Sequence, residues 1–194
     1  MALENVYITA ATRTAVGKAG RGSLVNVRPD DMAAAVLASV CERSGISPDQ
    51  VEDVTLGCAM PEQAQGVNVA RIAAIAAGMP ETTSGVTINR FCSSGLEAMA
   101  MTAGKISAGM LDVAIAGGTE SMSMVQMPGA KVSPNPRLSK EKPEVYIGMG
   151  NAGDNVAKDF DISREDIDAF ALASNQKAAA AVAEGKFSDE ITAL

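Results

Sequence analysis

The sequence predicts an α/β fold in which a mostly parallel sheet is covered by helices on both faces. Short apolar, β-branched runs alternate with longer alanine-rich stretches in the order βαβαβαβ. Crossover helices between successive strands make those strands parallel. Of the 194 residues, 47% are hydrophobic but only 3% are aromatic. Aliphatic side chains and methionine therefore have to fill the interior, which suits close packing of helices on a sheet.

The predicted strands are short and bounded by turn-forming residues. They cover residues 6–12, 51–59, 85–89 and 112–116. Continuous apolar runs of this length are typical of strands buried on both faces of a parallel sheet. We therefore expect residues 6–12 to be a buried strand, followed by a loop over residues 13–27.

Three predicted helices alternate with these strands, and two more follow them. The first begins at Asp30 and Asp31, whose carboxylates suit the positive end of a helix dipole, and it ends before Gly45. The others cover residues 67–77, 96–108, 149–160 and 163–183. Ser163 and Asp166 form an S-x-x-D capping box at the start of the last helix.

The character of the sequence changes after Glu120. Residues 122–143 show no convincing periodicity, and this stretch contains Pro128, Pro134, Pro136 and Pro143. We expect a mobile excursion without a buried face, open to proteases. The chain thus falls into residues 1–120 and residues 121–194.

Cys92 is the strongest candidate for chemistry, because it follows the third predicted strand and precedes a helix. Its neighbours Ser93, Ser94 and Gly95 are small and leave room around the sulfur. Backbone N–H groups at the start of a helix favour a thiolate over a thiol. The position suits a nucleophile, but it also suits a buried cysteine that caps a strand. Position alone leaves both interpretations open.

Charge and cysteine content argue against several classes of protein. The formal net charge is −7, whereas a nucleic-acid surface needs clustered Lys and Arg. No segment reaches the roughly 20 apolar residues of a membrane helix, and Glu4 stands where a signal peptide carries positive charge. We therefore predict a cytoplasmic protein without a nucleic-acid or membrane partner. The 3 cysteines lack C-x-x-C spacing, which argues against a disulfide framework and a metal site.

Two glycine-rich segments resemble ligand loops. Residues 17–22 follow a predicted strand but lack the Gly-Lys-Ser/Thr order, and no helix begins directly after them, so we expect a surface loop. Gly117, Gly118 and Thr119 lead to Glu120. Without a partner in the pattern, the Glu120 carboxylate is expected to be a structural hydrogen-bond acceptor below the active site, in preference to an acid or a base.

The run from Asn89 through Cys92 to Ala98 closely resembles the nucleophile segment of the thiolases, and the 3-ketoacyl-CoA thiolase branch in particular. Further segments similar to family motifs follow in the expected order, at residues 13–18, 57–62, 68–71, 117–123, 149–150, 155–157 and 163–165. Ala15 stands where a proline is usual, and Asp154 where a glutamate is usual. The resemblance covers the whole chain and is weakest over residues 124–146.

This resemblance implies a thiolase-like core in residues 1–120 and the start of an inserted α-helical loop domain in residues 121–194. It implies an acyltransferase in which Cys92 attacks a 3-ketoacyl-CoA and forms an acyl-enzyme that CoA cleaves. Coenzyme A is then a substrate, and no cofactor is expected. Met149 lies in the family's Met-Gly motif and is the candidate substrate contact, the alternative being a buried methionine. Gly148 favours the degradative branch over a biosynthetic acetoacetyl-CoA thiolase.

Thiolase chemistry needs a histidine, and the chain contains 0 histidines. We therefore expect an N-terminal portion of an acetyl-CoA acyltransferase, inactive alone, without the family's histidine and second cysteine. The alternative is a non-catalytic thiolase-like binding or assembly module. A ketosynthase shares the fold, but the lead-in from Asn89 to Phe91 favours a thiolase. The family's pairing of third strands makes a homodimer or homotetramer the expected full-length form.

Overall fold

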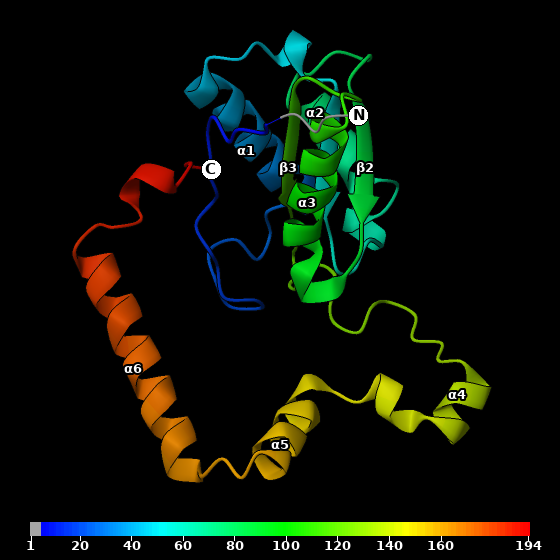
Figure 1. Cartoon of the computed structure of the whole chain (residues 1–194), viewed down its shortest axis with the longest axis vertical. Helices are drawn as coiled ribbons and strands as arrows, with labels where there is room; N and C mark the ends of the chain where they lie inside the picture. The colour runs from blue at the N-terminus through cyan, green and yellow to red at the C-terminus, as the bar shows by residue number, and fades with distance from the viewer. Residues whose placement is uncertain (1–4) are drawn as a thin grey trace. The chain divides into compact units, whose positions relative to one another are not determined.

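The computed structural model describes residues 5–194, which divide into two compact units (Figure 1). The first unit contains the described residues up to Ala130 together with Glu190–Leu194. The second unit is Lys131–Asp189. The two units are defined by the contacts that residues make within the chain. The domain limits expected from the sequence, 1–120 and 121–194, stay a prediction.

The first unit is built on a three-stranded parallel sheet. Its central strand β1 (Asp53–Gly57) lies between β2 (Ser84–Ile88) and β3 (Ala114–Gly118). The register places Gly57 beside Ile88 on one side and beside Gly118 on the other, so the carboxyl ends of all three strands meet at one edge. Every residue of β1 is buried, as expected for the middle of a parallel sheet.

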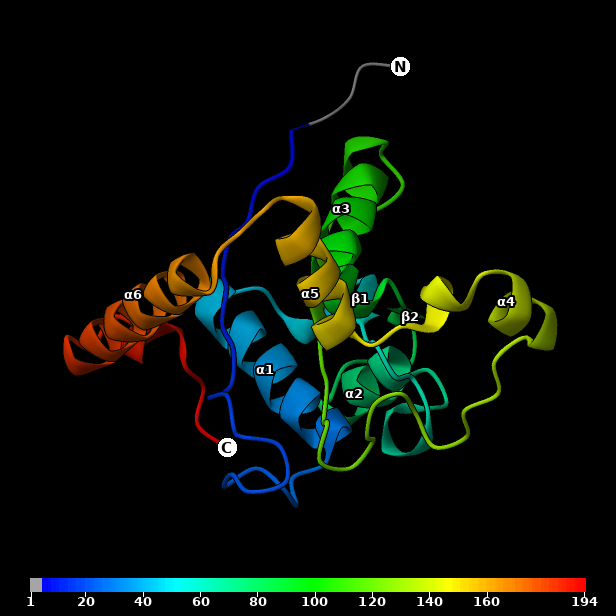
Figure 2. The same ribbon diagram turned by 90° about the horizontal axis from the view of Figure 1, so that it is seen from below.

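Helices cover both faces of this sheet (Figures 1 and 2). Helices α1 (Pro29–Ser44) and α2 (Val69–Ala76) pack on each other on one face, and α3 (Ser94–Ser107) covers the other. Because β2 and β3 flank β1 on opposite edges, right-handed crossovers place α2 and α3 on opposite faces. The predicted α/β architecture with helices on both faces is confirmed.

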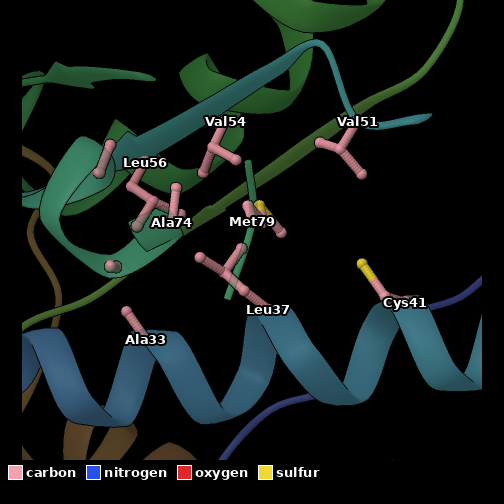
Figure 3. Packing of buried hydrophobic residues seen from close by; sticks show 10 residues of the cluster. Ala33, Leu37, Cys41, Val51, Val54, Leu56, Ala74 and Met79 are labelled. Carbon is pink, nitrogen blue, oxygen red and sulfur yellow. The ribbon is translucent and has the colours of Figure 1, made fainter. Parts of the chain in front are cut away.

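The hydrophobic core lies between β1 and the pair of helices α1 and α2. Val54 and Leu56 of β1 are 0% and 3% exposed, and Leu37 of α1 is 2% exposed. Figure 3 shows Leu37 and Ala74 beside these strand residues. The other members of the cluster are Ala33, Cys41, Val51, Ala70, Ala73 and Met79. Alanine, branched aliphatic and sulfur side chains fill this interior, as the composition predicts.

Residues 6–12 do not form the buried strand that the sequence predicts. Tyr7 and Ile8 are 78% and 74% exposed, and the backbone pairing nearby is an isolated bridge between Arg13 and Ile191. A cavity of about 780 Å³ lies between this segment and β3, and residues of α1 and α3 also line it. A β-branched run becomes a strand only where a partner strand lies within hydrogen-bonding distance. The free edge of β3 lies on the other side of the cavity, so residues 6–12 have no partner strand within this distance in the described part of the chain.

The start of β3 also differs from the prediction. The strand begins at Ala114 and not at Asp112. The Glu52 carboxylate accepts hydrogen bonds from the N–H groups of Asp112 and Val113, which therefore belong to a side-chain-capped turn. The other predicted strands and helices of this unit form within a few residues of their expected limits.

The second unit consists of helices. Helix α4 (Pro136–Glu141) forms inside the stretch predicted to lack secondary structure, because the Asn135 side chain accepts from two N–H groups of its first turn. It is followed by α5 (Met149–Asp159) and α6 (Arg164–Ala183). Ser163 caps α6 by accepting the Asp166 N–H, which confirms the predicted start. Across the described residues, no helix has both the length and the apolar character needed to cross a bilayer.

We expect trypsin to cut the folded chain first between residues 131 and 142. This stretch begins at the limit of the first unit, and its basic residues Lys131, Arg137, Lys140 and Lys142 are all exposed. Arg71 and Lys105 lie in helices that pack on the sheet, so they should be cut later. Mass spectrometry of a timed digest makes the comparison. Early cuts at Arg71 or Lys105 would contradict the predicted order.

Candidate active site

Cys92 lies in the turn that joins β2 to α3. A short 3-10 turn covers Phe91–Ser93, and α3 begins at Ser94. The thiol therefore stands at the start of a helix, as predicted. Cys92 is exposed, whereas Cys41 and Cys58 are buried. Within the described residues Cys92 is therefore not the buried cysteine of the alternative interpretation, and its role as a nucleophile stays a prediction.

Residues 89–94 are called the Cys92 turn here. Hydrogen bonds from side chains within this turn fix its backbone conformation. Asn89 Oδ1 accepts the Phe91 N–H at 2.8 Å. Ser94 Oγ accepts the Arg90 N–H at 2.8 Å and donates to the Phe91 carbonyl at 2.6 Å. Phe91 has φ 47°, in the left-handed region that residues with a Cβ rarely adopt. The turn therefore keeps a conformation that Phe91 itself disfavours.

The start of α3 approaches the end of β1 closely, and Gly57 makes this approach possible. A Cβ on Gly57 would overlap the backbone of Ser94 and lie 2.6 Å from the Gly95 nitrogen. Gly118 is the neighbour of Gly57 on β3, and a Cβ there would lie 3.0 Å from the Gly57 carbonyl oxygen. The absence of side chains at these strand ends lets the N-terminus of α3 sit directly on the sheet.

Glu120 follows β3 and binds the segment that follows β1. Its carboxylate accepts the Ala59 N–H at 2.6 Å and the Met60 N–H at 3.3 Å. Gln65 Nε2 donates to it at 2.6 Å, and Gln65 is 0% exposed. Glu120 is therefore a structural hydrogen-bond acceptor, as the sequence predicts.

Cys58 lies against the same carboxylate, with its Sγ 3.7 Å from Glu120 Oε1. Burial first, and then the negative charge of Glu120, raise the pKa of Cys58 to about 12. Burial also raises the pKa of Cys41. Both groups stay protonated at neutral pH, and a thiol is far less nucleophilic than a thiolate.

A cavity of about 360 Å³ opens beside Cys92. The end of β1, the Cys92 turn and the loop after β3 line it, together with Met122 and Met127. This volume lies at the lower end of the range for small-molecule sites, which is roughly 300 to 1,000 Å³. The exposed thiol of Cys92 thus borders a small, open hollow of the surface.

Met149 lies in the second unit, where it is the first residue of α5 and 75% exposed. Within this unit it is not the buried methionine of the alternative interpretation. Its contact with substrate stays a prediction. Among the residues that the structure describes, no group of three or more His, Cys, Asp or Glu side chains could hold a metal ion.

Limiting iodoacetamide should label Cys92 before the other two cysteines of the folded chain. Cys92 is exposed, while Cys41 and Cys58 are buried and have raised pKa values. Peptide mapping after short reaction times measures the three rates, and the urea-unfolded chain is the control in which all three should react at similar rates. Labelling of Cys41 or Cys58 as fast as Cys92 in the folded chain would contradict the assignment.

The chain matches the family model described as "Thiolase, N-terminal domain" over residues 6–193. It is 48% identical over 189 residues to a 3-ketoacyl-CoA thiolase of Bacillus subtilis (strain 168), an alignment that covers 97% of this chain and 48% of that protein. It is 42% identical over 191 residues to the peroxisomal 3-ketoacyl-CoA thiolase 1 of Arabidopsis thaliana, covering 97% of this chain and 43% of that protein.

The fold of this chain is also similar to a solved structure. The crystal structure of the Bacillus anthracis acetyl-CoA acetyltransferase superposes with a TM-score of 0.84 at 37% sequence identity, covering 98% of this chain and 50% of that chain. The chain spans about half the length of the curated relatives that it matches.

Proposed function

Because this chain belongs to the thiolase family, we propose that it is the nucleophile-bearing part of an acyltransferase that cleaves a 3-ketoacyl-CoA with CoA. The observation that carries the proposal is the exposed Cys92 at the start of α3, beside a small cavity. The names of the relatives, 3-ketoacyl-CoA thiolases, support a CoA thioester as the substrate class. Coenzyme A is then a substrate, and the proposal includes no cofactor.

In the proposed reaction the Cys92 thiolate attacks the 3-keto carbonyl. The bond between C2 and C3 of the acyl chain breaks, and its electron pair takes a proton at C2, so that acetyl-CoA leaves. The shortened acyl group stays on the sulfur as a thioester. The thiol of free CoA attacks this thioester, releases the shortened acyl-CoA and regenerates Cys92. A thiolate suits both steps, because it is a strong nucleophile and a good leaving group.

The start of α3 stabilises negative charge at this position. The dipole of α3 places a partial positive charge at its first turn, although the 3-10 turn before it already supplies acceptors for the Ser93 and Ser94 N–H groups. This partial charge favours the oxyanion that forms when Cys92 attacks. The proposal therefore assigns to this chain the nucleophile and part of the oxyanion stabilisation.

The general base has to come from elsewhere, since the chain contains 0 histidines. We place it, with further oxyanion donors, in the part of a longer protein that corresponds to the other half of the relatives. Met149 remains the proposed substrate contact from the second unit. A homodimer or homotetramer is proposed for that longer protein. The cytoplasmic location also stays a prediction, and several of the relatives are peroxisomal by name.

A biosynthetic acetoacetyl-CoA thiolase is the second candidate. The likeness to a solved structure titled acetyl-CoA acetyltransferase favours it. The same nucleophile serves both directions of the reaction, so the two candidates differ in the acyl chain that they accept. Relative rates with acetoacetyl-CoA and with 3-ketooctanoyl-CoA separate them.

The test is acyl transfer to Cys92 in a fusion of this chain to the remaining half of the Bacillus subtilis relative. Incubation with 3-ketooctanoyl-CoA, without free CoA, should leave a hexanoyl group on the peptide that carries Cys92. The Cys92→Ala fusion is the control and should carry no adduct. A folded fusion without a hexanoyl group on Cys92 would contradict the proposal.

A further inference from the structure

A continuous series of hydrogen bonds links the ends of the three strands to the Cys92 turn. Glu120, after β3, accepts the Ala59 N–H at 2.6 Å. The carbonyl of Ala59, after β1, accepts from Asn89 Nδ2 at 3.0 Å. Asn89, after β2, uses its Oδ1 to accept the Phe91 N–H at 2.8 Å. Phe91 is the residue directly before Cys92, so the series ends at the backbone that carries the thiol.

Asn89 is suited to the middle of this series because its amide both donates and accepts. The donated bond reaches a residue 30 positions away in the sequence, and the accepted bond stays inside the turn. An aspartate could accept the Phe91 N–H but could not donate to the Ala59 carbonyl. An alanine could do neither, and Phe91 would then hold its left-handed φ of 47° without this support.

The far end of the series is anchored by buried groups. Gln65 is 0% exposed and donates from Nε2 to both Glu120 and the Met60 carbonyl. Its Oε1 accepts the Ser121 N–H. Buried polar groups whose hydrogen bonds are satisfied hold a single arrangement more firmly than exposed ones do. Glu120 therefore fixes the position of Ala59 through its hydrogen bond to the Ala59 N–H, and Gln65 in turn fixes Glu120.

We infer that Asn89 is a positioning residue for Cys92, and that Glu120 acts on Cys92 through Ala59 and Asn89. The inference rests on the proposed role of Cys92 as the nucleophile. Its test measures alkylation of the isolated chain and not acyl transfer in the fusion, so either result can fail without the other. The family resemblance implies roles for Cys92 and Met149, whereas the structure adds the contacts of Asn89 that orient Cys92.

The test is the rate constant for iodoacetamide alkylation of Cys92, measured as a function of pH in Asn89→Ala, in Glu120→Ala and in the double variant. Cys41 reports on folding in the same samples, because it is buried and reacts only when the chain opens. Cys58 serves as a second reporter in Asn89→Ala only, because its thiol contacts Glu120. Asn26→Ala is the matched control, since Asn26 is an exposed asparagine of the same unit.

At neutral pH we expect each single variant to lower the rate constant of Cys92 roughly 3- to 10-fold, as the loss of one net hydrogen bond implies. The pH–rate profile of Cys92 should shift, while Cys41 stays protected and Asn26→Ala changes nothing. Because the two residues act in series, the double variant should be no slower than the slower single variant.

Two results would overturn the role of Asn89. One is an unchanged pH–rate profile of Cys92 in a folded Asn89→Ala chain. The other is equal loss of protection at Cys41 and Cys58, which would mean that Asn89 serves the stability of the whole unit and not the orientation of Cys92. Additive effects in the double variant would exclude the route from Glu120 through Asn89.

Discussion

The purified chain is expected to cleave acetoacetyl-CoA and a longer 3-ketoacyl-CoA no faster than its Cys92→Ala variant does. It carries the proposed nucleophile but 0 histidines to take the proton from it. Loss of a general base alone typically lowers a rate by roughly 10² to 10⁴. Missing oxyanion donors lower it further.

The measurement is CoA-dependent loss of the 3-ketoacyl-CoA, followed by absorbance. The fusion to the remaining half of the Bacillus subtilis relative is the positive control, and we expect it to be faster than the chain alone by roughly 10² or more. Turnover by the chain alone at the level of the fusion, abolished by Cys92→Ala, would show that it needs no second half.

Leu37→Ala should lower the free energy of unfolding of the chain by about 3 kcal/mol. Leu37 is 2% exposed, and in α1 it packs against the buried face of β1 (Figure 3). Removing a buried leucine side chain loses its transfer free energy and leaves a cavity, at a cost of roughly 2 to 5 kcal/mol.

Urea unfolding followed by circular dichroism measures this change. Leu96→Ala is the matched control, because Leu96 lies in α3 of the same unit and is 71% exposed. A surface substitution of this kind should change the free energy of unfolding by less than about 0.5 kcal/mol. Equal effects of the two substitutions would mean that the core does not lie between α1 and β1.

The elements that the sequence predicts well carry their own local signals. Helix α1 has Asp30 and Asp31 in its first turn and Gly45 after its last, and α6 has the Ser163 cap. The prediction for residues 6–12 failed because a strand depends on a partner, and no local pattern reports whether one is present. The sequence pattern does not predict helix α4, because the prolines around it indicate a loop more strongly than Asn135 indicates a helix cap.

The candidate site divides in the same way. The place of Cys92 follows from the change of a β-branched run into small residues and a helix, all within a few positions. The role of Asn89 cannot be predicted from the local sequence, because its hydrogen-bond partner Ala59 lies 30 positions away in the chain. Glu120 could be predicted as an acceptor, whereas its donors come from a loop that only the packing of β1 against β3 brings near.

The left-handed backbone conformation of Phe91 has opposite consequences for stability and for the orientation of Cys92. A glycine at this position would relieve a cost of about 1 kcal/mol and so would rank among the favourable changes in a screen for thermostability. The same glycine would let the backbone in front of Cys92 visit other conformations, which weakens the hold of Asn89 and Ser94 on it. Natural selection for turnover should retain a side chain here, and a laboratory selection for heat resistance alone should lose it.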